Sequence, residues 1–229
     1  CEAVSAVFRA GITPSAMEFM ERDAIDWVMK FIEVNIEVKE STKAHLLVEV
    51  DGNDAETLMR DCERISEVMY QFDCDEILIA ETAAQKENLW KMRRRVAEAV
   101  RSHAVYKEED TVVPRAELAK LLKGVKEIGN RYGFKSVCYG HAGDGNLHVN
   151  IIKENLSDEE WTNKLPLGIR EIFELCVELG GTISGEHGIG WVQKGYMDIP
   201  FDEVQIKLMK GIKTLFDPND ILNPGKIFN

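Results

Sequence analysis

Residues Tyr139–Asn150, with the sequence Y-G-H-A-G-D-G-N-L-H-V-N, carry the strongest structural signal in this chain. Turn-forming residues dominate the centre of this stretch, and segments of alternating polarity flank it on both sides. The pattern predicts a β-hairpin whose two antiparallel strands cover Ser136–His141 and Leu147–Ile152. Such a hairpin would place His141 opposite His148 on neighbouring strands.

The two faces of the predicted hairpin differ in polarity. Because side chains alternate along a strand, His148 and Asn150 share one face, and Leu147, Val149 and Ile151 share the other. The apolar set is the expected core face, so the polar set faces a cavity or solvent. Two histidines brought together in this way suit a divalent metal such as zinc, iron or manganese. A pair of surface histidines without a metal is the alternative, and the hairpin alone does not separate the two.

A second stretch, residues 180–190, has the sequence G-G-T-I-S-G-E-H-G-I-G. Its five glycines allow sharp turns and the close approach of a ligand around the adjacent Glu186 and His187. Glu186 would complete a set of two histidines and one carboxylate, which leaves coordination positions open as in a catalytic metal site. His187 would then be free to act as a base. The alternatives are a plain glycine-rich turn or a phosphate-binding loop, although the G-x-G-x-x-G pattern is absent and a glutamate would repel phosphate.

The rest of the chain mixes helices and strands without a strict βαβ alternation. Capping boxes of Ser15 with Glu18 and of Ser157 with Glu160, and a cap at Asp54, indicate where three helices begin. We expect helices over Ser15–Phe31, Asp54–Met69, Gln85–Arg101, Arg115–Tyr132, Ser157–Glu178 (broken or kinked near Pro166) and Asp202–Phe216, and further strands over Ala44–Asp51, Glu76–Ala80 and Thr182–Ser184. This order predicts an α+β fold with helices on one face of an antiparallel sheet. The tail from Asp217 contains prolines and a glycine, so no regular structure is expected there.

The composition excludes several classes of protein. The 229 residues are 45% hydrophobic and carry a net charge of −12 at pH 7, so nucleic acid is not an expected partner. Five cysteines without a Cys-x-x-Cys pair favour reduced thiols in a cytoplasmic protein. No apolar run reaches the roughly 18 residues of a membrane span and no signal peptide is evident, while peripheral contact with the inner membrane stays open. The start at Cys1, within an apolar phrase, suggests a piece of a longer protein.

A third stretch, Asn88–Val100, carries three adjacent arginines in a helical pattern. Successive helical residues point about 100° apart, so Arg93, Arg94 and Arg95 do not share one face. One arginine could hold a carboxylate through a bidentate pair while the others pair with the acidic surface. A solvated basic face is the alternative.

Taken together, these stretches resemble the C-terminal domain of FAD-linked oxidases, the group of the glycolate oxidase large subunit, D-lactate dehydrogenases and D-2-hydroxyglutarate dehydrogenase. The similar motifs are H-A-G-D-G-N-L-H-V-N, S-G-E-H-G-I-G and the ending D-P-N-D-I-L-N-P-G-K-I-F, joined by G-I-T-P at 11–14, L-W-x-x-R at 89–93 and E-D-T-V-V-P-R at 109–115. The resemblance covers nearly the whole chain. It implies two ferredoxin-like halves forming an antiparallel sheet flanked by helices. It also implies that residues 1–229 are the substrate and cap domain, with the flavin in a separate N-terminal FAD domain that is absent here.

The resemblance also implies roles for single residues. His141, His148 and Glu186 are then metal ligands, His187 the general base, and Arg93 and Asn150 contacts to the substrate. Lys107 is a second, basic substrate contact. Asn223 and Lys226 belong to a tail that returns towards the flavin cofactor.

The function implied is oxidation of a 2-hydroxy acid, similar to glycolate or D-lactate, to a 2-oxo acid with FAD and a divalent metal. The implied partners are the chain's own FAD domain, an electron-transfer subunit and further copies in a homo-oligomer. This chain alone is then expected to be inactive. Two alternatives remain: a stand-alone metal hydrolase, active without flavin, and a non-catalytic ferredoxin-like docking module, which would bind neither metal nor hydroxy acid.

Overall fold

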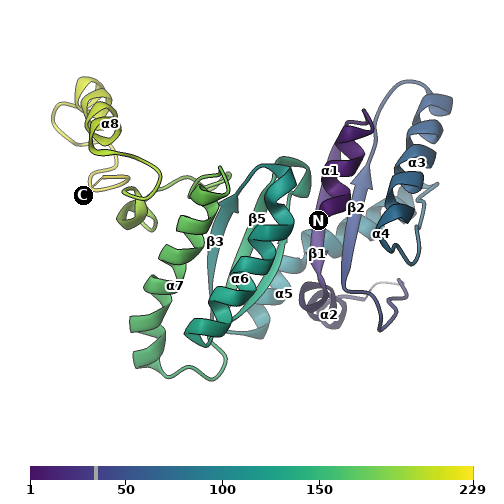
Figure 1. Ribbon diagram of the computed structural model, residues 1–229, viewed down its shortest axis with the longest axis horizontal. Helices are drawn as coiled ribbons and strands as arrows, with labels where there is room; N and C mark the ends of the chain where they lie inside the picture. Colours follow the sequence, from purple (N-terminus) through teal and green to yellow (C-terminus); the bar gives the residue numbers. More distant parts are fainter. Residues whose placement is uncertain (34–35, 229) are drawn as a thin grey trace.

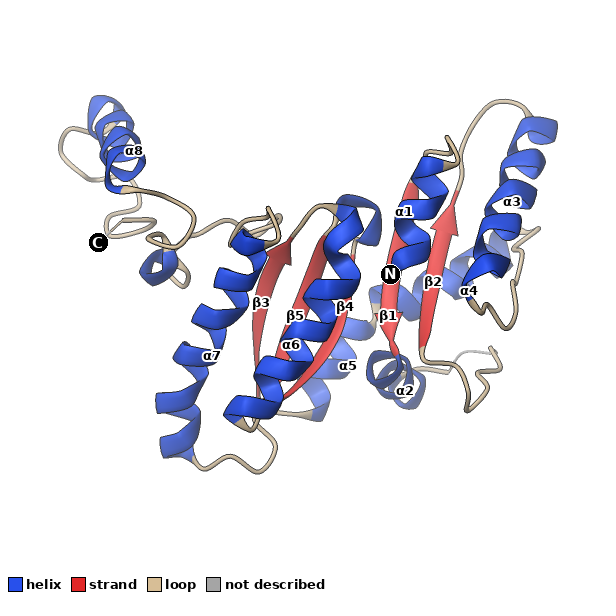
Figure 2. Ribbon diagram, in the orientation of Figure 1, coloured by secondary structure: helices blue, strands red, loops and turns tan. Residues whose placement is uncertain are grey.

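A computed structural model describes residues 1–33 and 36–228 as an α+β fold around one antiparallel sheet (Figures 1 and 2). The sheet has five strands in the order β2-β1-β4-β5-β3. The strands are β1 (Ala16–Glu21), β2 (Ala44–Glu49), β3 (Tyr106–Val112), β4 (Lys135–Gly140) and β5 (Asn146–Ile152). The predicted antiparallel sheet flanked by helices is confirmed.

Helices cover both faces of the sheet, not one face as expected from the sequence. One face carries α1 (Glu2–Arg9), α3 (Ala55–Met69), α6 (Leu118–Tyr132) and α7 (Asp158–Glu178), and the other carries α2 (Arg22–Phe31), α4 (Ala83–Arg94) and α5 (Val96–His103). In Figure 1, α6 and α7 lie in front of the sheet and α4 and α5 behind it. The reason is visible in β5, where every residue is buried, so that both of its faces need a covering layer.

The segment from β3 to Thr182 follows the strand-helix-strand-strand-helix-strand order of a ferredoxin-like unit. Its last strand is reduced to one bridge between Thr182 and Val112, in place of the predicted strand Thr182–Ser184. The preceding part of the chain adds two strands, β1 and β2, to the same sheet. The two halves are therefore unequal.

The predicted hairpin is present as β4, a 3-10 turn η3 (Ala142–Asp144) and β5. Gly145 adopts a positive φ of 77° at the end of the turn, which favours glycine. Leu147, Val149 and Ile151 enter the core shared with α6 and α7, as their alternation predicts. The opposite face of β5 therefore carries His148 and Asn150.

The first predicted helix, Ser15–Phe31, begins seven residues before α2 does. Residues of the expected capping box lie in and beside strand β1, which pairs with β2 over its whole length. Met17 and Phe19 enter one core cluster and Met20 the other, so pairing and two-sided burial outweigh the local capping signal. Ser15 donates a hydrogen bond from Oγ to the carbonyl oxygen of Glu49 at 3.1 Å.

Other boundaries also differ from the prediction. Glu76–Ala80 is not a strand, and the basic helix is divided at Arg95 into α4 and α5. Strand β3 was not predicted, because its sequence Y-K-E-E-D-T-V is too polar to resemble a buried strand. Helix α7 runs through Pro166 as one element, so it is not broken there.

The C-terminal part is set apart from the sheet. The predicted last helix is α8 (Glu203–Phe216), capped by Asp202, and it lies with the irregular tail at the end of the molecule (Figure 1). The remaining 3-10 turns are η1 (Tyr70–Phe72), η2 (Arg115–Glu117) and η4 (Lys194–Tyr196). All five cysteines are free, as expected. Within the described residues, no helix combines the length and the apolar character that crossing a membrane would require.

Candidate metal and substrate site

The hairpin brings His141 and His148 together. His148 lies in β5 opposite Tyr139 of β4, and His141 follows directly after the end of β4. The two imidazole rings are 5.6 Å apart between centroids and meet edge to face at 78°. His148 is 5% exposed, whereas His141 is half-buried. The predicted juxtaposition of the histidines is thus present.

Glu186, on the loop after α7, joins the two histidines. Its Oε1 lies 3.3 Å from His141 Nε2 and 3.3 Å from His148 Nε2. A tetrahedral ion bound at about 2.0–2.2 Å separates its ligands by about 3.3–3.6 Å. The two distances to Glu186 match this spacing, and all three donor atoms lie within 4.8 Å of one another, so the set of two imidazoles and one carboxylate fits a divalent metal.

Glu18 of β1 contacts one of these three residues, His141, and also the buried Arg93. Its Oε1 lies 2.8 Å from His141 Nδ1, and its Oε2 accepts from Nε of Arg93 at 2.8 Å. Burial alone would raise the pKa of Glu18, but the hydrogen bond with His141 and the charge of Arg93 outweigh it, so the pKa lies below its ordinary value. The hydrogen bond to Glu18 likewise raises the pKa of His141. A proton on Nδ1 directed at Glu18 leaves the Nε2 lone pair free for a metal.

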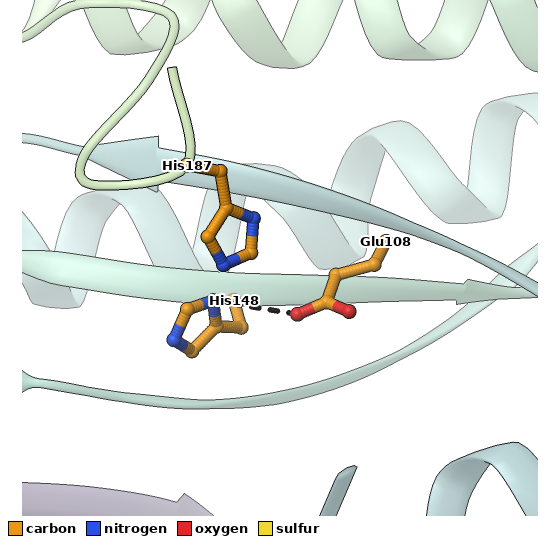
Figure 3. Close-up of side chains that lie close together, drawn as sticks. All are labelled: Glu108, His148 and His187. Carbon is orange, nitrogen blue, oxygen red and sulfur yellow. Dashed lines mark ion pairs between the residues drawn. The ribbon is translucent and has the colours of Figure 1, made fainter. Parts of the chain in front are cut away.

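His148 differs from His141 in its protonation. Burial, together with the positive charge of Arg93, lowers the pKa of His148 to about 4, so this imidazole is neutral near pH 7. Its second nitrogen, Nδ1, faces Glu108 of β3, with Oε1 at 3.5 Å. Burial raises the pKa of Glu108. Figure 3 shows Glu108, His148 and His187 pointing toward one another.

Asp110 of β3 fixes the loop that carries Glu186 and His187. Its Oδ2 accepts hydrogen bonds from the backbone N–H of Glu186 at 2.7 Å, from that of His187 at 2.8 Å and from Ser184 Oγ at 3.0 Å. Its Oδ1 accepts from Asn146 Nδ2 at 2.6 Å. These bonds outweigh burial and keep the pKa of Asp110 below its ordinary value. Because the loop N–H groups are already used, the alternative of a phosphate-binding loop loses its main support.

Two loop glycines are required by close packing. A Cβ at Gly181 would lie 1.9 Å from the carbonyl oxygen of Val112, and a Cβ at Gly185 would lie 1.9 Å from Nδ2 of Asn146. The glycine-rich sequence thus allows the loop to pack directly on β3 and the hairpin.

The three adjacent arginines have different surroundings, as in the prediction that one of them holds a carboxylate while the others pair with the acidic surface. Arg93 is buried, pairs with Glu18 and lies over the ring of Tyr139 at 5.2 Å, next to His148. Arg94 and Arg95 pair with surface glutamates of the same region. A guanidinium has five N–H donors, so the pair with Glu18 leaves donors for a ligand.

Some of the remaining predicted site residues lie near His141, His148 and Glu186, and others lie elsewhere. Asn150 is fully buried on the same strand face as His148, and its Nδ2 donates to the Val137 carbonyl at 3.2 Å. His187 is exposed and stacks on His148 with ring centroids 5.2 Å apart. Lys107, in contrast, is on the opposite face of β3, where its Nζ pairs with the buried Glu109 at 2.7 Å. The alternation of β3 therefore takes Lys107 away from the site.

Asn223 and Lys226 also lie apart from the metal set. Lys226 Nζ donates to Asn223 Oδ1 at 3.0 Å within the C-terminal turns. Figure 1 places these turns beside α8, away from the sheet that carries His148. The structure brings together six of the nine predicted site residues, namely Arg93, His141, His148, Asn150, Glu186 and His187.

Three acidic residues of the site were missed from the sequence: Glu18, Glu108 and Asp110. Glu18 was assigned to a helix cap, and the other two lie in the strand that was not predicted. The sequence Y-K-E-E-D-T-V could have indicated them. When β3 pairs with β5, Glu108 lies opposite Asn150 and Asp110 lies opposite His148, so both acids share the face of these two residues.

Comparison with known proteins gives one consistent group of relatives. The family described as FAD linked oxidases, C-terminal domain, matches residues 1–227. A D-lactate dehydrogenase of Anaerostipes hadrus is 36% identical over 225 residues, covering 96% of this chain and 47% of that protein. The glycolate oxidase subunit GlcD of Bacillus subtilis is 35% identical over 228 residues, covering 99% of this chain and 48% of that protein. The chain therefore spans about half the length of these relatives.

A solved structure shows the same fold at low sequence identity. p-Cresol methylhydroxylase with substrate bound superposes with a TM-score of 0.64 and 12% identity, over 99% of this chain and 50% of that one. This likeness concerns the fold alone.

Proposed function

We propose, from the premise that this chain belongs to the C-terminal domain family of the FAD-linked oxidases, that it forms the metal- and substrate-binding part of an FAD-dependent 2-hydroxyacid dehydrogenase. The observation that carries the proposal is the convergence of His141 Nε2, His148 Nε2 and Glu186 Oε1, with the buried Arg93 on the same face of the sheet. The names of the two relatives, a D-lactate dehydrogenase and a glycolate oxidase subunit, agree with it.

The metal set accounts for activation of the substrate hydroxyl. A divalent ion held by His141, His148 and Glu186 supplies Lewis acidity that lowers the pKa of an alcohol, as it does for water. With these three residues as its protein ligands, such an ion would keep coordination positions open for a 2-hydroxy acid. Glu18 keeps His141 oriented by accepting its Nδ1–H.

The remaining residues bind and deprotonate the substrate. Arg93 binds the carboxylate through the guanidinium donors that Glu18 does not use, which orients C2 of the substrate. A ring nitrogen of His187, exposed above His148, accepts the hydroxyl proton. When bound, the flavin would supply the acceptor for the hydride from C2. The products are a 2-oxo acid and reduced flavin.

The proposed function also requires partners for this chain, first of all a flavin-binding half. Exposed apolar side chains on and after α8 offer a surface for the flavin-binding half, among them Leu208, Leu215, Phe216 and Ile221. Because one relative is named as a subunit, an electron-transfer subunit is a further proposed partner. Self-association into a homo-oligomer remains part of the proposal.

The test uses the full-length protein loaded with FAD and with zinc or manganese. Glycolate and both enantiomers of lactate and of 2-hydroxyglutarate are mixed with it in the absence of oxygen. We expect one of these acids to bleach the flavin, and deuterium at C2 to slow the bleaching. His187→Gln should slow reduction at least 100-fold with a small effect on substrate affinity.

Other outcomes would favour a different assignment. If none of the acids reduces the flavin in the metal-loaded protein, the assignment fails. If flavin-free protein hydrolyses a test ester in a zinc-dependent manner, a metal hydrolase is favoured instead.

A further inference from the structure

The loop that carries Glu186 and His187 has a second attachment, on the opposite face of β3 from Asp110. Gln193 donates a hydrogen bond from Nε2 to Oε2 of Glu109 at 3.3 Å. Both side chains are buried, with 1% of Glu109 and 6% of Gln193 exposed. The reaction proposed above makes no use of this contact.

The carboxylate of Glu109 depends on two partners. Lys107 Nζ lies 2.7 Å from its Oε1, and the Gln193 amide bonds to its Oε2. Burial raises the pKa of Glu109, although the charge of Lys107 and the bonds from both partners act against it. A buried carboxylate that loses a donor costs free energy, so the bond to Gln193 stabilises the position of both residues.

The two attachments of the loop belong to one edge strand. β3 is the outer strand of the sheet (Figure 2), and its side chains alternate between the two faces. Asp110 therefore holds the loop from one face and Glu109 from the other. Thr182 forms a bridge with Val112 at the end of β3, so the loop passes round the free edge of this strand.

Within the loop, two hydrogen-bonded turns follow one another directly. Ser184 Oγ accepts from the N–H of Gly188 at 2.8 Å, and the carbonyl oxygen of Ile189 accepts from the N–H of Gln193 at 3.1 Å. The first turn contains Glu186, and the second ends at Gln193. Because the second turn begins at the residue after the first, a shift of the second turn is expected to move the first as well.

We propose that Glu109 and Gln193 are positioning residues for Glu186. They hold the second turn on one face of β3 while Asp110 holds the first turn on the other, and the Glu186 carboxylate thereby stays within reach of the two histidines. The contact acts through the loop and touches neither metal nor substrate. The role of Glu186 as a metal ligand rests on the proposed function, whereas the attachment of the loop does not.

The test is Gln193→Met in the full-length protein, which keeps the approximate size of the side chain and removes its donor. In the metal-free form, amide hydrogen exchange should show about tenfold lower protection at Glu186 and His187, with the amides of β5 unchanged. The affinity for zinc, measured against a competing chelator, should fall by a similar factor. Gln193→Asn, which shortens the side chain by one methylene, is a second variant with the same expected effects.

The matched control is Gln71→Met, the same substitution at an exposed glutamine, which should change neither quantity. An equal loss of protection in β5 would overturn the proposal, because Gln193 would then stabilise the whole fold instead of the loop. Unchanged protection at Glu186 and His187, or a zinc affinity equal to that of the wild-type protein, would overturn it too. If protection falls as expected but the wild-type protein binds no zinc, the attachment of the loop stands and the proposed metal site fails.

Discussion

Removing the carboxylate of Asp110 should release the loop that carries Glu186 and His187. The substitution Asp110→Asn keeps the size of the side chain and changes its hydrogen bonding. The native carboxylate accepts from three donors of the loop, Ser184 Oγ and the backbone N–H of Glu186 and His187, at 2.7–3.0 Å. An amide has only one oxygen, so it faces the loop with a neutral acceptor or with a competing N–H₂ group.

The size of the effect follows from these three bonds. A hydrogen bond to a charged group contributes about 1.5–3 kcal/mol, and one to a neutral group about 0.5–1.5 kcal/mol. If the amide oxygen faces the loop, each bond therefore weakens by about 1 kcal/mol, or about 3 kcal/mol for the loop. Because each 1.4 kcal/mol corresponds to about tenfold, the population of the open loop should rise about 100-fold.

Amide hydrogen exchange measures this opening without depending on a bound metal. Protection of the backbone N–H groups of Glu186 and His187 should fall about 100-fold in Asp110→Asn, with amides of the central strand β5 unchanged. The control is Asp144→Asn, which removes the same charge from an exposed residue of the hairpin turn and should leave the protection of both amides unchanged. Protection that stays within threefold of the wild-type value at both amides would refute the role assigned to Asp110.

Three further changes test other parts of the site. Glu18→Gln should lower the pKa of His141 in a histidine NMR titration of metal-free protein, because Glu18 raises it above 6.5. The stability that this pair contributes should accordingly be present below pH 6.5 and be lost as the pH rises through the raised pKa. Gly185→Ala should lower the free energy of unfolding by about 1–3 kcal/mol in a urea titration, since its Cβ would overlap an asparagine amide, whereas Gly195→Ala, where nothing lies within 4 Å, should change it little. Lys107→Met should reduce stability and leave the KM for a 2-hydroxy acid unchanged, because the lysine pairs with a buried glutamate on the opposite face of the sheet.

The fold was predictable where a signal is local. Asp54, Ser157 and Asp202 each accept a hydrogen bond from the third residue of the helix that follows, and all three helices begin where these caps indicate. The same kind of signal at Ser15 was misleading, because pairing of β1 with two neighbouring strands stabilises an extended conformation that no local pattern reveals. Long-range pairing therefore limits what a single sequence can predict here.

The convergence of His141, His148 and Glu186 was predictable for a different reason. A short hairpin fixes the relation of His141 to His148 within eight residues of chain, and the glycines beside Glu186 indicate a loop packed closely on its neighbours. The partners that orient these ligands come from more distant parts of the sequence. Glu18 reaches His141 across 123 residues and Asp110 reaches the Glu186 N–H across 76 residues. No spacing rule connects such positions.

The register of β3 determines the chemistry of the site more than any motif does. In the sequence K-E-E-D, Lys107 and Glu109 alternate with Glu108 and Asp110, so each face of the strand carries an acid and polarity alone does not say which face meets the histidines. The observed pairing sets Asp110 opposite His148. A slip of one residue would exchange the two faces, placing Lys107 beside His148 and removing the acceptor of the Glu186 loop. Whether Lys107 lies near the substrate site therefore depends on the register of β3. A hydrogen bond from Asn146 Nδ2 to the Thr111 carbonyl at 3.0 Å helps to hold the observed register, in which Lys107 lies on the opposite face from His148.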